Sequence, residues 1–174
     1  PRVSGNVYYG ETTTKPMVTL TTVTLTPNVP PGPPVTVSPT AGGAYNISPV
    51  TDGTYLLTGA TTKTWNGMTT FDATLILRYA AGVPGFGLSN LQKRAADVNM
   101  TNTANGVTTF DATLILRRAA VVPTPQWIAP NFVFDGPYPS TPALIGLPVT
   151  VSGSDVTQTL KTLCSGDVNG SYPS

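Results

Sequence analysis

The chain has 174 residues and almost no net charge, with nine Lys and Arg against eight Asp and Glu. It contains no histidine and one cysteine, which excludes a Ser-His-Asp triad, a Cys-His dyad, an internal disulfide and almost every catalytic zinc site. Sparse, scattered cations argue against nucleic-acid binding, which needs a clustered basic face. Since Glu11 is the single glutamate, few acids are left for a glycosidase-type pair, and a non-catalytic protein is expected.

The composition predicts a β-rich extracellular protein. Thirty threonines, 18 prolines and 17 glycines favour strands, turns and extended loops. Only 10% of residues are charged, which is low for a cytoplasmic protein. We therefore expect secretion or a cell-surface location, with O-linked glycans on Thr and Ser, and no transmembrane segment. The missing initiator methionine indicates a processed product or a cut segment, without its signal peptide.

Residues 1–64 have the pattern of β-strands. The stretches VSGNVYY and VTLTTVTLTP alternate apolar side chains with Thr or Ser, as expected for strands with one buried face. A proline-rich loop at 27–34 interrupts them. The same texture returns at 127–163. The fold class predicted is therefore α+β, with a small β-sandwich made from 1–64 to which 127–163 contributes further strands.

Between these β segments, residues 65–126 contain a nearly exact repeat. Residues 66–84 and 105–123 are identical at 16 of 19 positions, with a spacing of 39 residues. Each copy contains TTFDATLILR, whose apolar residues recur at helical spacing. In the first copy the predicted buried side consists of Ala73, Ile76, Leu77 and Ala80. A short helix over 88–96, N-capped by Ser89, separates the two copies.

The second copy has the pattern of a calcium-binding loop. An EF-hand-type loop distributes oxygen ligands over twelve residues and ends in an acid at the start of the exiting helix. The stretch DVNMTNTANGVTTFD supplies such oxygens over fifteen residues, so three residues must bulge out. The candidate Ca²⁺ ligands are Asp97, Asn99, Thr101 or Asn102, Thr108 and Asp111. The alternative is that Asp111 only caps the helix.

The first copy lacks the front half of this loop, and Lys63 stands where an acid would be needed. The missing half occurs near the end of the chain, in the tail 164–174, as GDVNGSY. We therefore predict one split site whose candidate ligands are Thr69 and Asp72 together with Asp167, Asn169 and Ser171. The tail would reach back within the molecule or to a neighbour; the alternative is a disordered tail.

The duplicated DVN…GVTxxDAxLILRxxA resembles the dockerin type I module, a pair of EF-hand-like calcium loop–helix segments that docks onto a cohesin domain. The resemblance covers 66–123 and the tail, and it implies Ca²⁺ as the cofactor. It also implies that the two residues before each closing acid contact a partner, here Thr70 with Phe71 and Thr109 with Phe110. A core-filling role for the two phenylalanines is the alternative.

The flanking stretch VSGNVYY…GGAYNISPVTDGTYLLTGATTKTW is similar to the small Ig-like sandwiches of carboxypeptidase-regulatory and Cna-B modules. Such modules and dockerin-like repeats occur together in secreted surface proteins of the Bacteroidota, whose closing stretches the C-terminal residues resemble.

Three functions remain open. The first is a calcium-stabilised structural module that self-associates into a surface filament or scaffold. The second is a targeting module of a secreted hydrolase that binds a cohesin-like partner. The third is a carbohydrate-binding β-domain that stacks sugars on aromatic rings, although core packing of these rings is the simpler interpretation. The aromatic candidates are Tyr8, Tyr9, Trp65, Trp127 and Tyr138.

Overall fold

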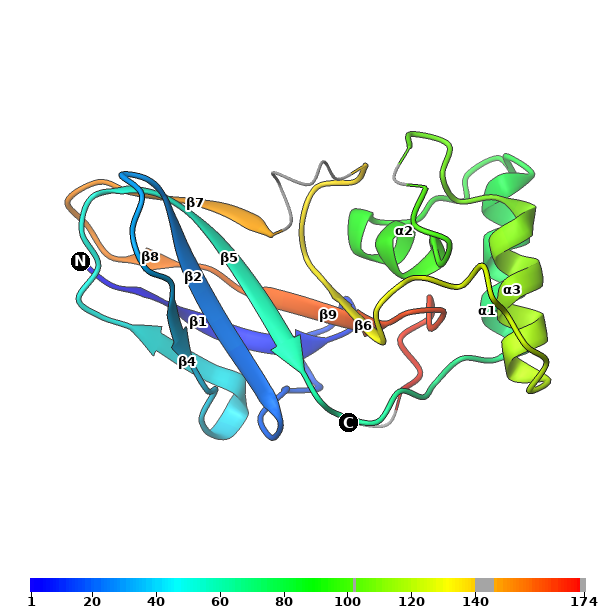
Figure 1. Ribbon diagram of the computed structural model, residues 1–174, viewed down its shortest axis with the longest axis horizontal. Coiled ribbons are helices and arrows are strands. Elements are labelled where there is room, and N and C mark those ends of the chain that lie inside the picture. Colours follow the sequence, from blue (N-terminus) through cyan, green and yellow to red (C-terminus); the bar gives the residue numbers. More distant parts are fainter. Residues whose placement is uncertain (102, 140–145, 173–174) are drawn as a thin grey trace.

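The computed structural model describes residues 1–101, 103–139 and 146–172. Within these residues the protein combines two β-sheets with three α-helices, so it is a mixed α and β protein dominated by sheet (Figure 1). The sheets occupy one end of the elongated molecule and the helices the other (Figure 1).

The first sheet joins strands from both ends of the sequence. Its order is β4 (Ala44–Ile47), β1 (Val3–Tyr9), β9 (Leu160–Cys164) and β6 (Phe132–Phe134), with β8 (Val156–Thr157) also beside β1. Strands β8 and β9 both run parallel to β1 and pair with it in one continuous register. Gly5 lies at the step between them, where an added Cβ would lie 1.9 Å from the Gln158 carbonyl oxygen. Only glycine allows this close approach of the two backbones.

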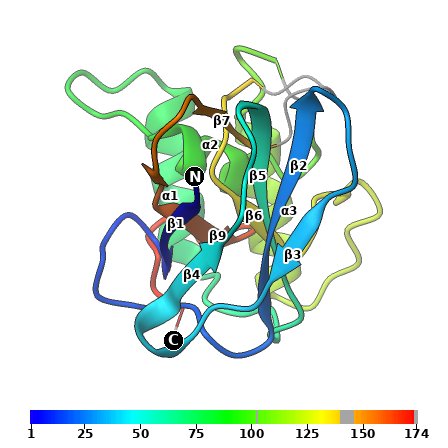
Figure 2. The ribbon, with the colours of Figure 1, turned by 90° about the vertical axis from the view of Figure 1, so that its left-hand side faces the viewer.

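The second sheet is antiparallel throughout. Its order is β3 (Val35–Val37), β2 (Thr21–Val29), β5 (Gly53–Thr61) and β7 (Leu147–Val151). A short 3-10 turn, η1 (Ala41–Gly43), leads into β4. Viewed from the sheet end, β2 and β5 lie on one side of the molecule and β1 and β4 on the other (Figure 2). Strands from 1–64 and from 127–163 are thus neighbours in both sheets.

The alternation of apolar and threonine side chains places the core between the two sheets. In β2, Val23 and Leu25 are buried, whereas Thr24 lies on the outer face and its hydroxyl is 2.8 Å from that of Thr36 on β3. The inner faces of both sheets contribute to one hydrophobic cluster, which gives a sandwich-like arrangement.

The repeated sequence forms two helices that pack against each other. Helix α1 (Thr70–Ala80) and helix α3 (Thr109–Ala119) run side by side in opposite directions (Figure 1). Each begins with a capping box and buries equivalent residues, Ala73 and Ile76 in α1 and Ala112 and Ile115 in α3. Together they form a second hydrophobic cluster outside the sheets.

The predicted buried side of the first helix is partly wrong. Leu77 is 41% exposed and Ala80 is exposed, so the buried stripe is rotated away from them. It passes instead through Asp72, which is fully buried, and through Tyr79, which packs against the second cluster. A polar residue on the inner side does not register in a hydrophobic pattern, and for this reason the periodicity misplaced the stripe.

Helix α2 (Asn90–Ala96) connects the two hydrophobic clusters. As predicted, Ser89 is its N-cap, and its side chain accepts a hydrogen bond from Gln92 N. Leu91 and Ala95 belong to the core between the sheets, whereas Ala96 belongs to the cluster around α1 and α3. The helical and sheet parts are therefore packed onto each other through α2.

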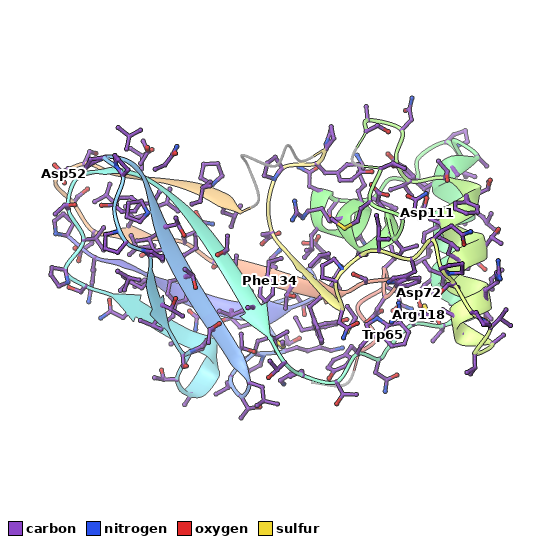
Figure 3. All side chains as sticks on the ribbon, viewed as in Figure 1. Asp52, Trp65, Asp72, Asp111, Arg118 and Phe134 are labelled. Carbon is purple, nitrogen blue, oxygen red and sulfur yellow. The ribbon has the colours of Figure 1, made fainter. Side chains whose placement is uncertain are left out.

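A cation–π contact also ties the helices to the segments that connect them with the sheets. The Arg118 guanidinium of α3 lies 4.2 Å from the ring centroids of both Trp65 and Trp127. Figure 3 shows Arg118 beside Trp65. The two indoles meet edge to face, with centroids 6.0 Å apart. Trp65 Nε1 donates to the Ser165 carbonyl oxygen at 2.9 Å, which extends the contact to the residue that follows β9.

The partly buried carboxyl of Asp135, just after β6, makes the stability of the fold depend on pH. Its Oδ2 accepts a hydrogen bond from Lys161 N at 2.8 Å, and burial, together with the nearby charge of Glu11, raises its pKa to about 6 despite Lys161 and Arg94. The folded state holds this proton more tightly than the unfolded state. The group's ionisation therefore lowers the free energy of unfolding as pH rises from about 4 to about 6.

We predict that Asp135→Asn, which keeps an acceptor for Lys161, flattens this pH dependence and stabilises the protein at pH 7 by about 1–3 kcal/mol. Urea unfolding at pH 4 and pH 7 in the presence of a chelator measures the effect. The exposed Asp52, changed to Asn, is the control. An unchanged pH dependence in Asp135→Asn would contradict the raised pKa of Asp135.

Candidate functional site

The two repeated helices begin with the same arrangement around a buried aspartate. At α1, the backbone N and Oγ1 of Thr69 both donate to Asp72 Oδ2 at 2.8 Å. At α3, the same two atoms of Thr108 donate to Asp111 Oδ2 at 2.9 and 3.0 Å. One carboxylate oxygen of each aspartate thus caps its helix, and the other faces a second segment of the chain.

The second segment is different for the two helices, but its contact is equivalent. Asp111 Oδ1 accepts from the backbone N of Val98 at 3.0 Å and of Asn99 at 3.4 Å. Asp72 Oδ1 accepts from the backbone N of Asn169 at 3.0 Å. The tail therefore folds back within the same chain and occupies at α1 the place that the Asp-Val-Asn segment of the second repeat occupies at α3.

The aspartates that open the two Asp-Val-Asn segments also have matching contacts. Asp97 Oδ1 accepts from Thr101 N at 2.9 Å, and Asp167 Oδ1 accepts from Ser171 N at 3.0 Å. In each case the hydroxyl of the same Thr or Ser lies 3.3 Å from that oxygen. Each aspartate thus closes a tight turn onto the residue four positions later, which brings a hydroxyl next to the carboxylate.

A tyrosine hydroxyl contacts the remaining oxygen of each opening aspartate. Tyr9 OH donates to Asp167 Oδ2, and Tyr138 OH donates to Asp97 Oδ2 at 3.0 Å. Burial raises the pKa of both phenols, and the neighbouring carboxylate raises it further. Both hydroxyls therefore stay protonated and act as donors.

A glycine at the same position of each repeat leaves room for these groups. An added Cβ at Gly67 would lie 2.6 Å from Asp167 Oδ2, and one at Gly106 would lie 2.6 Å from Thr101 Oγ1. The Gly67 carbonyl oxygen accepts a hydrogen bond from Ser171 Oγ at 2.8 Å. Any side chain at these positions would fill the space in front of the carboxylates.

The two candidate sites concentrate negative charge away from solvent. Asp72, Asp111 and Asp167 are fully buried and Asp97 is 2% exposed. Burial raises the pKa of Asp111 and Asp167, and the negative charge of Asp97 and of Asp72, respectively, raises it further. In the described part of the chain, Asp72, Asp111 and Asp167 form no ion pair with Lys or Arg. Buried carboxylates held close together repel each other, and a bound cation would offset both this repulsion and the cost of burying their charge.

The donor atoms at both sites fit a hard cation such as calcium. Carboxylate and hydroxyl oxygens are present at each, and the buried Oδ1 of Asn99 has no hydrogen-bond partner among the described residues. Among residues 1–101, 103–139 and 146–172, no three or more His, Cys, Asp or Glu side chains come together in a group that could hold a metal ion. Each site therefore has two carboxylates, and further ligands would have to be neutral oxygens.

The structure thus gathers most of the predicted ligands into two clusters. The first contains Thr69, Asp72, Asp167, Asn169 and Ser171, and the second contains Asp97, Asn99, Thr101, Thr108 and Asp111. Asn102 lies outside the described residues. In Figure 3, Asp72 and Asp111 belong to the two ends of the helix pair, so the clusters are separate.

Sequence reasoning missed four residues of these clusters. Gly67 and Gly106 carry a visible signal, because both repeats contain the same Asn-Gly pair. Tyr9 and Tyr138 carry none, because the residues around them do not resemble each other and lie outside the repeated sequence.

The Thr-Phe pairs that precede the closing aspartates lie on the surface. Phe71 is 56% exposed and Phe110 is 43% exposed, and Thr70 and Thr109 are exposed as well. The core-filling alternative for the two phenylalanines is therefore excluded. Leu77 and Leu116, each six residues after the phenylalanine of its helix, are both 41% exposed, so the two helices carry matching exposed apolar residues.

Four of the five aromatic candidates, Tyr9, Trp65, Trp127 and Tyr138, have side-chain partners inside the protein. Tyr9 is fully buried in the core between the sheets, and Arg118 lies over the rings of both Trp65 and Trp127. This leaves less free ring surface for stacking on a sugar. The single Cys164 is also buried, and burial raises the pKa of its thiol to about 11.

None of the helices in the described residues is long and apolar enough to cross a bilayer. Comparison of the chain with protein-family models, with curated proteins and with solved structures finds no match.

Proposed function

We propose that this chain is a non-catalytic structural module of an extracellular protein, stabilised by two Ca²⁺ ions at the N-termini of α1 and α3. The single observation that carries the proposal is the equivalence of the two clusters. Asn169 N at Asp72 reproduces the contact of Val98 N and Asn99 N at Asp111, although one partner comes from the repeat and the other from the tail.

The first site would be formed by Asp72 and Asp167, with oxygens of Thr69, Asn169 and Ser171 within reach. The second would be formed by Asp97 and Asp111, with oxygens of Asn99, Thr101 and Thr108. Bound calcium would supply the positive charge that neutralises each buried carboxylate pair. The likeness of the repeat to dockerin type I modules supports the same assignment.

The split site gives calcium a structural role, because Asp72 and Asp167 are far apart in sequence. Linking two such positions removes conformational entropy from the unfolded chain. In the chain-entropy model a covalent link across a loop of roughly 100 residues contributes up to about 4.7 kcal/mol. A metal ion held only in the folded state provides such a link reversibly, and it would hold the tail on α1.

The assembly function follows from what the single molecule leaves exposed. Since the tail folds back onto α1 of its own chain, contacts between molecules would use other surfaces. These are the outermost strands of the two sheets and the exposed residues Phe71, Leu77, Phe110 and Leu116 on the helix pair. We propose that these surfaces link copies of the module into a filament or scaffold, with the Thr-rich surface carrying O-linked glycans.

A second candidate function, docking onto a cohesin-like partner, is favoured by the matching exposure of Phe71 and Phe110. The two antiparallel helices present the same Thr-Phe pair twice. The helix surface could therefore receive one partner in two orientations.

Calcium is predicted to raise the unfolding temperature of the purified chain. Binding restricted to the folded state adds about 2.7 kcal/mol per site when free calcium is 100 times the dissociation constant. Differential scanning calorimetry in calcium and in EDTA measures the shift, with magnesium as the comparison ion. Identical melting curves in EDTA and in millimolar calcium would refute the proposed sites.

Charge-neutralising substitutions are predicted to remove the two sites one at a time. Asp167→Asn should reduce the calcium stoichiometry from two to one, because it removes one of the two charges at the split site. Asp111→Asn should remove the other site, and the exposed Asp52→Asn should remove neither. Titration calorimetry gives the stoichiometries. Two intact sites in Asp167→Asn would show that the tail does not contribute to calcium binding.

The double variant Phe71→Ser, Phe110→Ser is predicted to prevent assembly without lowering the unfolding temperature, since both side chains are already largely exposed. Sedimentation velocity in calcium compares it with the wild type and with Val29→Ser, which removes an equally exposed apolar side chain from β2. A monomeric wild type that binds an immobilised type I cohesin domain would favour the docking function. Undiminished assembly of the double variant would place the contacts on the strand edges.

A further inference from the structure

Two tyrosines outside the repeats hold the aspartates that open the two sites. Tyr9 is the last residue of β1 and is fully buried. Its hydroxyl accepts a hydrogen bond from Cys164 N on β9 at 2.9 Å and donates one to Asp167 Oδ2. One phenol therefore connects two adjacent strands of the first sheet directly to the split site.

Tyr138 makes the corresponding connection at the other site. It follows β6 in sequence, and its hydroxyl donates to Asp97 Oδ2 at 3.0 Å. The close approach depends on Gly106, where an added Cβ would lie 2.3 Å from the Tyr138 hydroxyl. As at the first site, a phenol reaches the opening aspartate from a segment attached to the first sheet.

The equivalence of the two tyrosine contacts does not follow from the duplication of the helices. Tyr9 lies in VYYGE and Tyr138 in GPYPS, which are unrelated stretches outside the repeated sequence. Each hydroxyl nevertheless donates to the Oδ2 of an opening aspartate, Asp167 or Asp97. The Oδ1 of the same aspartate accepts the backbone hydrogen bond that closes its turn. The same donor at the same acceptor atom, supplied by two unrelated segments, points to a common requirement of the two sites.

The requirement is the orientation of a buried carboxylate. A phenol donates only one proton, so it engages Oδ2 and leaves Oδ1 directed at the loop. Hydrogen-bonded partners behind a metal ligand hold it in the binding orientation, and their loss typically lowers metal affinity by about 10–100-fold. Tyr9 also anchors the carboxylate to the backbone of β9, so movement of the strands and of Asp167 is coupled.

We propose that Tyr9 and Tyr138 are positioning residues of the two calcium sites, which orient Asp167 and Asp97 and couple each site to the first β-sheet. This inference rests on the proposed function, since it concerns how the same sites bind calcium. It adds that metal binding and the packing of the sheet stabilise each other, rather than calcium acting on the helix pair alone.

The test compares calcium affinities of Tyr9→Phe, Tyr138→Phe and the control Tyr45→Phe by titration calorimetry. Tyr45 is also a core tyrosine of the first sheet, and its hydroxyl donates to the Gln158 carbonyl oxygen away from both sites. We expect each of the first two variants to weaken one site by about tenfold or more. Tyr45→Phe should bind both ions like the wild type even where it lowers stability in EDTA.

To show which tyrosine acts on which site, the tyrosine substitutions are repeated in an Asp167→Asn background, where only the second site should remain. There Tyr138→Phe should still weaken binding by about tenfold, and Tyr9→Phe should have no effect. Tyr138 is only half-buried, so its variant keeps the test available if Tyr9→Phe does not fold.

The outcomes separate the two levels of the proposal. A wild type that binds no calcium overturns the proposed function itself. A wild type that binds two ions, with unchanged affinities in both Tyr9→Phe and Tyr138→Phe, leaves that function standing and overturns the positioning role. Equal weakening by Tyr45→Phe would also overturn it, because the effect would then reflect general loss of stability.

Discussion

The arrangement of this protein depends on the buried carboxylate of Asp72. One oxygen caps α1 through Thr69, and the other accepts the backbone N–H of Asn169 in the tail. A helix N-terminus and the end of the chain are thereby held by the same side chain, and Tyr9 at the end of β1 contacts the same tail through Asp167. Val168, next to this contact, is buried in the cluster around α1 and α3. The tail is thus part of the core of the helical half.

Buried carboxylates are costly unless their charge is compensated, and hydrogen bonds from backbone N–H groups compensate only part of it. The cation–π contact of Arg118 with Trp65 and Trp127 places the nearby positive charge over aromatic rings rather than against Asp72 or Asp111. The proposed calcium ions would compensate the remaining charge of both buried carboxylate pairs. The proposed calcium sites are also linked to the stability of both halves of the molecule. Helix α2 and the tail each contribute buried residues to the cluster between the sheets and to the cluster around α1 and α3.

Much of the candidate site was predictable because ligand spacing is local. The Asp-Val-Asn triplet, the Thr-Thr-Phe-Asp run and the capping role of Ser89 are read directly from short stretches. The burial of α1 was less predictable. Leu77 belongs to the apolar periodicity but is exposed, whereas Asp72 breaks that periodicity and is fully buried. The inner side of this helix is set by the tail and by α3, and neither is visible in the helix's own pattern.

The sequence by itself determined the strand segments, the repeated helices, the Ser89 cap and the two Asp-Val-Asn halves, since each depends on side chains within about ten neighbouring positions. Only the tertiary structure decided that the tail closes onto its own α1, that strands from 127–163 pair with β1 and β5, and that Tyr9 and Tyr138 reach the opening aspartates. These contacts join residues that are far apart in the chain. Their formation depends on how the two hydrophobic clusters pack, which no local pattern records.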